Sequence, residues 1–189
     1  MTRSIVIIII AFFSGLFLWP IFNSKSDFVL KNSIGGDFVL INDVGVFDTK
    51  YLKNDLLMVY FGFTFCPDVC PTELARLAKV KNALGPSSSK VKFLFITLDP
   101  ERDNPKLVSE YARVFDSEFI GLTGSIEQIH KVAEQFGIFF RRVEGEGKED
   151  YTIDHTSRIL LLDSSGSVLG VFGFDSSEED MLREIRKSF

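Results

Sequence analysis

The 189-residue sequence lacks any long block of charge of one sign, and it contains very little cysteine and histidine. Its net charge is only -5, and lysine, arginine, aspartate and glutamate are spread along the chain. A nucleic-acid-binding protein would carry a basic patch or stripe, so the composition excludes nucleic acid as an expected partner. Two cysteines and two histidines also leave few candidate metal ligands. No internal repeat is visible, and one domain is the default expectation for this length.

Charge is entirely missing from residues 5–22, which read IVIIIIAFFSGLFLWPIF. This run is close to the ~20 apolar residues that a helix needs to cross a bilayer. Arg3 precedes it, and the positive-inside rule then places the N-terminus in the cytoplasm and the remaining chain on the far side. A cleavable signal peptide is the alternative, but no small-x-small cleavage site follows the run. We expect an uncleaved membrane anchor with its tether at residues 1–27, and a folded domain at residues 28–189.

The compartment of the folded domain follows from this orientation. Nothing resembling a transit peptide precedes the apolar run, which predicts a single-pass protein of a bacterial inner membrane with its domain in the periplasm. The mitochondrial inner membrane is the organellar equivalent. The periplasm is oxidising, and two thiols there tend to form a disulfide unless a reductant or a metal holds them. The two cysteines therefore need a functional explanation.

The apolar pattern of the first half of this domain predicts a hairpin followed by a β-α-β unit. Residues 28–48 contain two apolar stretches around Gly35-Gly36, which is typical of a β-hairpin. Nearly continuous apolar runs at residues 56–65 and 91–97 suit strands that are buried on both faces. Between them, residues 71–85 have the spacing of a helix, with proline in its first turn and glycine at its end.

The second half adds helices and two closing strands. Helices are expected after the capping residues Asn104, Ser125 and Ser177. Residues 141–151 are charged and contain glycine, which predicts a surface loop. Two strands are expected at residues 158–163 and 168–174. The whole order is that of an α/β, thioredoxin-like fold with an N-terminal β-hairpin, preceded by one transmembrane helix.

Both cysteines lie in FTFCPDVCPTEL, residues 63–74, between a predicted strand and a predicted helix. Unpaired backbone N–H groups and the positive end of the helix dipole favour thiolates there. Pro71 would clash with the carbonyl of Pro67 in a continuous helix, so Cys66 to Cys70 is expected to form a turn or loop with both sulfurs on one side. A disulfide or two buried core residues is the structural alternative. Two flanking prolines make this junction a poor place for ordinary core residues.

Three residues separate the cysteines, one more than in a thioredoxin-type redox pair. Two soft thiolates suit a linear or trigonal monovalent copper ion, and an imidazole would complete a three-coordinate site. His130 lies on a polar helical face and is expected to be a solvated surface residue. His155 lies in the loop that enters the strand at 158–163, where it can meet the cysteine loop, although a loop histidine bonded to Asp154 or to the backbone is the plain alternative. Structural zinc is disfavoured because it takes four ligands, and Asp154 or Asp68 would be a poor fourth ligand.

Three further segments accompany the apolar run, namely FGFTFCPDVCPTEL, ITLDPERDNPKLVSEYARVF and EDYTIDHTSRILLLD. In this order and at these separations they resemble the SCO/SenC copper chaperones of cytochrome c oxidase assembly. The resemblance implies that Cys66, Cys70 and His155 bind a copper ion, Cu(I) or Cu(II), on a thioredoxin-like domain facing the periplasm. Two small departures are Phe65, where tyrosine is common, and Thr156, where serine is frequent.

The resemblance also implies partners and leaves the function open between three possibilities. Such proteins deliver copper to the binuclear CuA site of cytochrome c oxidase subunit II, or reduce its cysteines, and other periplasmic copper carriers or thioredoxin-like reductants are possible partners. Asp99, Arg102 and Asp103 fall on a family motif near the site, with a turn and helix-cap cluster as the alternative. A copper carrier, a thiol–disulfide oxidoreductase that attacks with Cys66 or Cys70, and a redox or copper sensor all begin with the same thiolates.

Overall fold

The structure, a computed structural model, describes residues 34–52, 55–145 and 151–189. The chain divides into two compact units, Met1–Ile34 and Gly35–Phe189, and the helices and strands described all belong to the second. The predicted anchor at residues 5–22 lies outside the described residues. None of the helices within the described ranges is long and apolar enough to cross a membrane.

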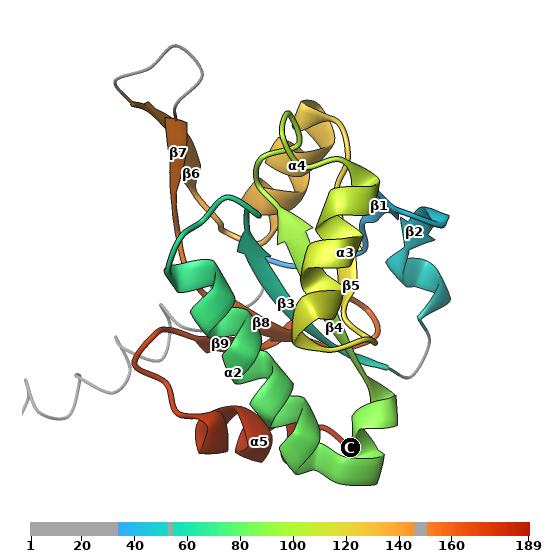
Figure 1. The fold of residues 1–189 in the computed structure, drawn as a ribbon. Coiled ribbons are helices and arrows are strands. Elements are labelled where there is room, and N and C mark those ends of the chain that lie inside the picture. Colours follow the sequence, from blue (N-terminus) through green and yellow to red (C-terminus); the bar gives the residue numbers. More distant parts are fainter. Residues whose placement is uncertain (1–33, 53–54, 146–150) are drawn as a thin grey trace, which may run out of the picture. The chain divides into compact units, whose positions relative to one another are not determined.

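Five of the described strands form a central sheet in the order β5-β4-β3-β8-β9 (Figure 1). Three of them run parallel, namely β3 (Leu56–Gly62), β4 (Val91–Thr97) and β5 (Ile120–Leu122). The other two, β8 (Ile159–Leu162) and β9 (Val168–Phe172), are antiparallel to their neighbours. Every residue of β3 is buried, as its continuous apolar sequence predicts for a central strand with both faces covered. The short β5 was not predicted, because three residues are too few to show a pattern.

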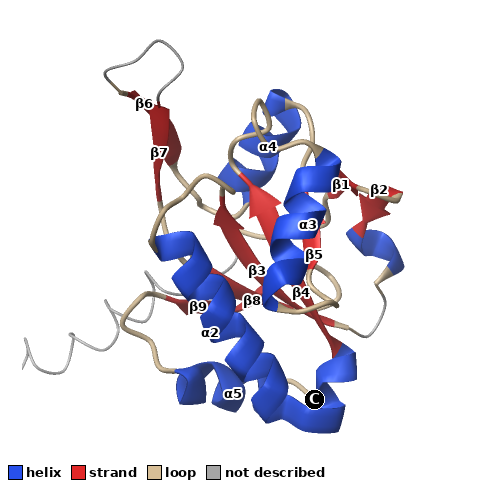
Figure 2. Cartoon of the chain, in the orientation of Figure 1, coloured by secondary structure: helices blue, strands red, loops and turns tan. Residues whose placement is uncertain are grey.

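Helices cover both faces of this sheet (Figure 2). They are α2 (Val69–Leu84), α3 (Pro105–Phe115), α4 (Ile126–Gln135) and α5 (Glu178–Lys187). α2 and α3 lie on one face, where Tyr111 of α3 packs against Phe95 of β4, and α5 packs beside α2. On the opposite face, Phe136 at the end of α4 packs against Phe61 of β3. The predicted thioredoxin-like α/β fold is confirmed.

The predicted starts of the last three helices are confirmed. The Asn104 side chain accepts a hydrogen bond from the backbone N–H of Leu107 at the start of α3. Ser125 and Ser177 each begin a capping box, at α4 and α5 respectively. Local hydrogen bonding by short polar side chains therefore fixes these helix starts, as the sequence indicated.

The start of α2 differs from the prediction. The helix begins at Val69 rather than Pro71, so Cys70 lies in its first turn, whereas Cys66 lies in the loop that joins β3 to α2. Proline is tolerated here because the first N–H groups of a helix have no intrahelical partner. The carbonyl of Pro67, with which the ring of Pro71 would clash inside a helix, lies before the helix begins.

The N-terminal hairpin is present, but its predicted turn is wrong. β1 (Val39–Asn42) pairs with β2 (Gly45–Asp48), and the Asn42 side chain accepts two backbone N–H groups in the turn between them. Gly35-Gly36 instead lets two chain segments cross closely. A Cβ on Gly166 would lie only 2.4 Å from the Gly36 carbonyl, and both residues of the Gly35-Gly36 pair have positive φ angles, 122° and 120°.

A second hairpin occupies the two ends of the loop that was predicted at residues 141–151, and residues 146–150 lie outside the described residues. β6 (Phe140–Glu144) and β7 (Tyr151–His155) form a separate two-stranded sheet that projects from the central sheet in Figure 1. His155 is therefore the last residue of a strand, not part of a loop as predicted. β6 was not predicted as a strand, because its arginines are exposed and its composition is that of a charged surface segment.

Candidate metal site

The two cysteines lie at the N-terminal end of α2. The backbone N–H of Cys66 donates to the carbonyl of Phe63, which closes a turn after β3. The Cys66 sulfur in turn accepts the backbone N–H of Cys70 at 3.5 Å, at the positive end of the helix dipole. Both thiols are free; Cys66 is partly exposed and Cys70 is fully buried. The sulfur of Cys66 thus meets solvent, whereas that of Cys70 faces the protein interior.

The last residues of β3 form the pocket that receives the Cys70 sulfur. Gly62 leaves the space for it, because a Cβ at this position would lie 2.7 Å from Cys70 Sγ, 3.0 Å from the Phe95 ring and 3.1 Å from the Tyr60 ring. The Tyr60 hydroxyl lies 3.7 Å from Cys70 Sγ, to which it donates, and 3.2 Å from the Ser157 hydroxyl. The sulfur therefore has a hydrogen-bond donor in Tyr60, and on the side of β3 it leaves no room for a side chain at position 62.

His155 reaches the same place from the end of β7. Its Nε2 lies 3.9 Å from Cys70 Sγ, and its ring packs edge-on against the rings of Tyr60 and Phe63. A separation of 3.9 Å suits two donors that each lie about 2.0–2.3 Å from a shared ion. Within the described ranges no three His, Cys, Asp or Glu side chains are already gathered as a metal cluster. Of the three predicted ligands, the imidazole and the buried sulfur are thus close enough to share an ion, and Cys66 contacts the backbone N–H of Cys70 beside them.

The two thiols differ in their protonation. A hydrogen bond from the Cys70 thiol lowers the pKa of Cys66 to about 3; burial opposes this, and His155 and backbone N–H groups support it. The pKa of Cys70 is raised, first by its hydrogen bond to Cys66 and then by burial. The pair therefore shares one proton at neutral pH, and the partial exposure of Cys66 together with the backbone N–H that its sulfur accepts favours Cys66 as the thiolate.

Cys66 is expected to react with iodoacetamide at a rate that is flat between about pH 5 and pH 8, because its thiolate fraction is already complete. An ordinary thiol, with a pKa of about 8.5, would slow about tenfold for each pH unit below 8. The measurement is the alkylation rate of the reduced protein, with the labelled cysteine located by mass spectrometry. In the control variant Cys66→Ser, Cys70 should label slowly. A Cys66 rate that drops tenfold per unit below pH 8 would contradict the assignment.

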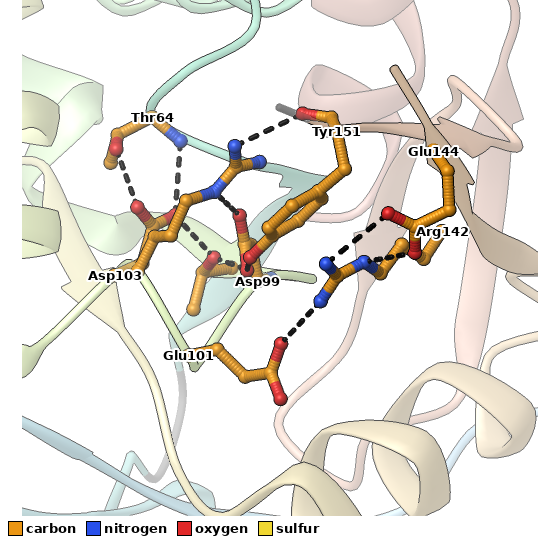
Figure 3. A network of polar contacts seen from close by, with 9 residues as sticks. Thr64, Asp99, Glu101, Asp103, Arg142, Glu144 and Tyr151 are labelled. Carbon is orange, nitrogen blue, oxygen red and sulfur yellow. Dashed lines mark hydrogen bonds and ion pairs between the residues drawn. The ribbon is translucent and has the colours of Figure 1, made fainter. Parts of the chain in front are cut away.

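Asp103, which was predicted near the site, binds Thr64 in the segment that precedes Cys66 (Figure 3). This fully buried carboxylate accepts the backbone N–H of Thr64 at 3.0 Å and the hydroxyls of Thr64 and Thr97, each at 2.5 Å. Thr64 stands two residues before Cys66. Burial raises the pKa of Asp103, and the hydrogen bonds from the threonines oppose this. Of the predicted alternative, the turn is present, since the backbone N–H of Asp103 donates to the Asp99 carbonyl at 2.8 Å, whereas the helix cap is supplied by Asn104.

The other polar residues that were considered as ligands make different contacts. His130 is exposed, as predicted, and its ring stacks on Phe140 at 4.5 Å. Asp154 forms an exposed ion pair with Arg141 at 2.9 Å, although it directly precedes His155. Asp68 occupies the N-cap position of α2, where its side chain makes no capping hydrogen bond.

Sequence reasoning missed Tyr60, Gly62 and Tyr151. Tyr60 carries the only hydroxyl in an otherwise apolar, fully buried strand, and a buried tyrosine hydroxyl usually has a partner, so a signal was present. Gly62 gave a weaker signal, since glycine within a strand often marks a close approach. Tyr151 gave none, because its role depends on contacts with residues about 50 positions earlier in the chain.

Comparison with known proteins agrees with this geometry. Residues 27–189 match the SCO1/SenC family. The SCO2-like protein of Rickettsia conorii is 41% identical over 155 residues, which are 81% of this chain and 76% of that protein. The structure of Bradyrhizobium japonicum ScoI with copper bound is 35% identical, with a TM-score of 0.75, and the match covers 83% of this chain and all of that one.

A more distant structure supports the fold. It is that of BsSco, described as having a disulfide switch and as a member of the Sco family of cytochrome c oxidase assembly proteins. It is 24% identical, with a TM-score of 0.65, and the match covers 82% of this chain and 94% of that one. The family match spans nearly the whole described chain, including both cysteines and His155. This chain therefore belongs to the SCO1/SenC family.

Proposed function

We propose that this protein is a copper carrier in which Cys66, Cys70 and His155 hold one copper ion. The observation that carries the proposal is the 3.9 Å separation of Cys70 Sγ and His155 Nε2, beside a Cys66 sulfur whose pKa is lowered to about 3. Two thiolates and one imidazole form a soft donor set that suits copper, Cu(I) above all. The copper-bound Bradyrhizobium relative supports the same cargo.

The unequal exposure of the ligands suits transfer of the ion. Cys70 is buried, whereas Cys66 is partly exposed, so an incoming thiolate of an acceptor protein can approach on the side of Cys66. Copper binding requires both sulfurs to be deprotonated, and the proton on Cys70 must leave. Copper uptake should therefore weaken as the pH falls, and it should fail when the two cysteines are oxidised to a disulfide.

The setting of this carrier is also part of the proposal. Residues 1–27 would anchor the protein in a bacterial inner membrane, and residues 28–189 would present the copper site in the periplasm, as the charge-free run at residues 5–22 favours. The acceptor would be the CuA site of cytochrome c oxidase subunit II. Family membership and the oxidase-assembly description of the Sco family support this choice.

The test of the function is growth under copper limitation with a chain that carries both Cys66→Ala and Cys70→Ala. Cytochrome c oxidase activity should fall, and added copper should restore it. Restoration by an added reductant instead of copper would favour thiol chemistry. Full oxidase activity without either supplement would contradict both functions.

Thiol–disulfide exchange is the second candidate, because a partly exposed thiol with a lowered pKa lies beside a buried thiol with a raised pKa. The Cys66 thiolate would attack a partner disulfide, forming a mixed disulfide and releasing one partner thiolate. Deprotonated Cys70 would then attack Cys66, which releases the second partner thiol and leaves an oxidised Cys66–Cys70 pair. This function predicts that His155→Ala leaves the exchange rate mostly intact.

The variant His155→Ala is expected to lower the Cu(I) affinity of the full-length protein by about 100-fold, because one of three donors is lost. Affinity is measured by competition with a chromophoric Cu(I) chelator under reducing, anaerobic conditions. His130→Ala is the matched control: it loses a stacking contact with Phe140 but no predicted copper donor, so its loss of affinity should be much smaller than that of His155→Ala. Equal affinity of the His155→Ala variant and the parent would remove His155 from the site.

A further inference from the structure

The β6–β7 hairpin, which carries His155, depends on contacts with the rest of the domain. β6 and β7 pair only with each other among the described strands, and a lone two-stranded hairpin is marginally stable at best. Its direction must therefore be set by side-chain contacts with the rest of the domain. Tyr151 is the first residue of β7 and His155 is the last. Contacts that hold Tyr151 therefore help to set the direction of β7, and with it the position of the His155 imidazole.

Tyr151 is held by the loop that follows β4 (Figure 3). Its hydroxyl donates to Asp99 Oδ1 at 2.8 Å, and its carbonyl accepts from Arg102 Nη1 at 3.0 Å. The Arg102 guanidinium also lies 3.5 Å from the centroid of the Tyr151 ring, and its Nε donates to Asp99 Oδ2. The tyrosine is thus bound through its backbone, its ring and its hydroxyl.

The same loop also holds the cysteine segment. Asp103 accepts hydrogen bonds from Thr64, as described above. The Arg102 guanidinium lies 4.8 Å from the centroid of the Phe65 ring, and Phe65 directly precedes Cys66. One short loop therefore contacts both the segment that supplies the sulfurs and the strand that supplies the imidazole.

Burial distinguishes this cluster from ordinary surface ion pairs. The Asp99 side chain is 2% exposed and that of Arg102 is 21% exposed. On the same hairpin, the paired side chains of Arg141 and Asp154 are 77% and 59% exposed. Exposed pairs contribute little to stability, whereas removal of one partner from a buried pair leaves an uncompensated charge. The contacts of Asp99 and Arg102 are therefore the buried polar contacts of the hairpin, and they act beside the stacking of His130 on Phe140, the cross-strand neighbour of His155.

We propose that Asp99, Arg102 and Tyr151 are positioning residues that hold His155 against the two cysteines. The inference rests on the proposed copper function and assigns this cluster a role in it. When the cluster is broken, the sulfurs remain at the start of α2, but β7 loses the contacts that direct its last residue toward Cys70. Copper would then be held by the cysteines without the imidazole.

The test uses the full-length protein, reduced and loaded with one equivalent of Cu(I) alone. In the Arg102→Met variant, copper X-ray absorption should show both sulfur donors and a loss of the imidazole contribution. The Cu(I) affinity should fall about 10- to 100-fold, the range found when residues that orient metal ligands are changed. Arg113→Met is the matched control, because Arg113 makes a two-pronged ion pair with Asp43 of the other hairpin. It should give the parent spectrum and affinity.

A double variant separates positioning from general structural damage. In a His155→Ala background, Arg102→Met should cause no further loss of affinity, because the ligand that Arg102 positions is already absent. An additive loss, or a parent-like spectrum for Arg102→Met alone, would overturn this inference. A parent protein whose copper lacks sulfur and imidazole donors would instead contradict the proposed function. Should Arg102→Met fail to fold, Tyr151→Phe removes only the hydrogen bond to Asp99 and should show the same change to a smaller degree.

Discussion

Replacement of Cys70 by serine is expected to lower the Cu(I) affinity of the full-length protein by about 100- to 1,000-fold. Four-ligand zinc sites bind with about 10–16 kcal/mol, or about 2.5–4 kcal/mol for each ligand, and 1.4 kcal/mol is about tenfold in affinity. A serine hydroxyl stays protonated and is a hard donor that suits copper poorly. Competition with a Cu(I) chelator measures the loss.

The fold itself should survive this substitution. Serine is slightly smaller than cysteine, and its hydroxyl can pair with the Tyr60 hydroxyl that now donates to Cys70 Sγ. The free energy of unfolding without copper, measured in urea, should fall by at most about 1–3 kcal/mol, the cost of burying a hydroxyl, which the hydrogen bond to Tyr60 reduces. If affinity falls less than tenfold while the fold is intact, the buried sulfur is not a ligand.

The variant Gly62→Ala is expected to reduce both stability and copper affinity. The added methyl group would lie 2.7 Å from Cys70 Sγ, with the rings of Phe95 and Tyr60 at 3.0 and 3.1 Å on its other sides. Overpacking of this kind costs about 1–3 kcal/mol of unfolding free energy. Because the sulfur must move to admit the methyl group, its distance to His155 changes, and we expect at least a tenfold loss of Cu(I) affinity, in the range for disturbed ligand orientation.

A second glycine, Gly170, separates the loss of stability from the loss of copper affinity. At Gly170 of β9 a Cβ would lie 3.0 Å from the Phe172 ring, so Gly170→Ala also adds a methyl group against an aromatic ring, but away from the sulfurs. It should lower the free energy of unfolding and leave copper affinity unchanged. Equal losses of copper affinity in the two variants would show that stability alone explains the effect of Gly62→Ala.

The parts of the fold that depend on local interactions could be predicted from the sequence. The apolar runs predicted β3 and β4, and the capping residues Asn104, Ser125 and Ser177 predicted the starts of three helices. The turn of the first hairpin was misplaced because a glycine pair serves a close crossing with Gly166 as well as it serves a turn.

The second hairpin depends on tertiary contacts, and this is why it escaped prediction. β6 and β7 are stabilised by Asp99 and Arg102, which lie about 50 residues before Tyr151 in the chain. No apolar pattern within residues 141–151 could report that interaction. The candidate ligands could nevertheless be named from the sequence, because Cys66 and Cys70 share one short segment and His155 stands in a family motif, and their role in copper binding stays a prediction. What the sequence did not reveal is how the sulfur of Cys70 is seated and how the imidazole is directed toward it.

The most direct test of the copper site is X-ray absorption at the copper edge on the full-length protein loaded with one equivalent of Cu(I). We expect two sulfur donors, from Cys66 and Cys70, and one imidazole nitrogen, from His155, all at about 2.0–2.3 Å from the metal. In the His155→Ala variant both sulfur donors should persist and the imidazole contribution should vanish. A spectrum without sulfur donors, or an imidazole contribution that persists after His155 is removed, would contradict this expectation.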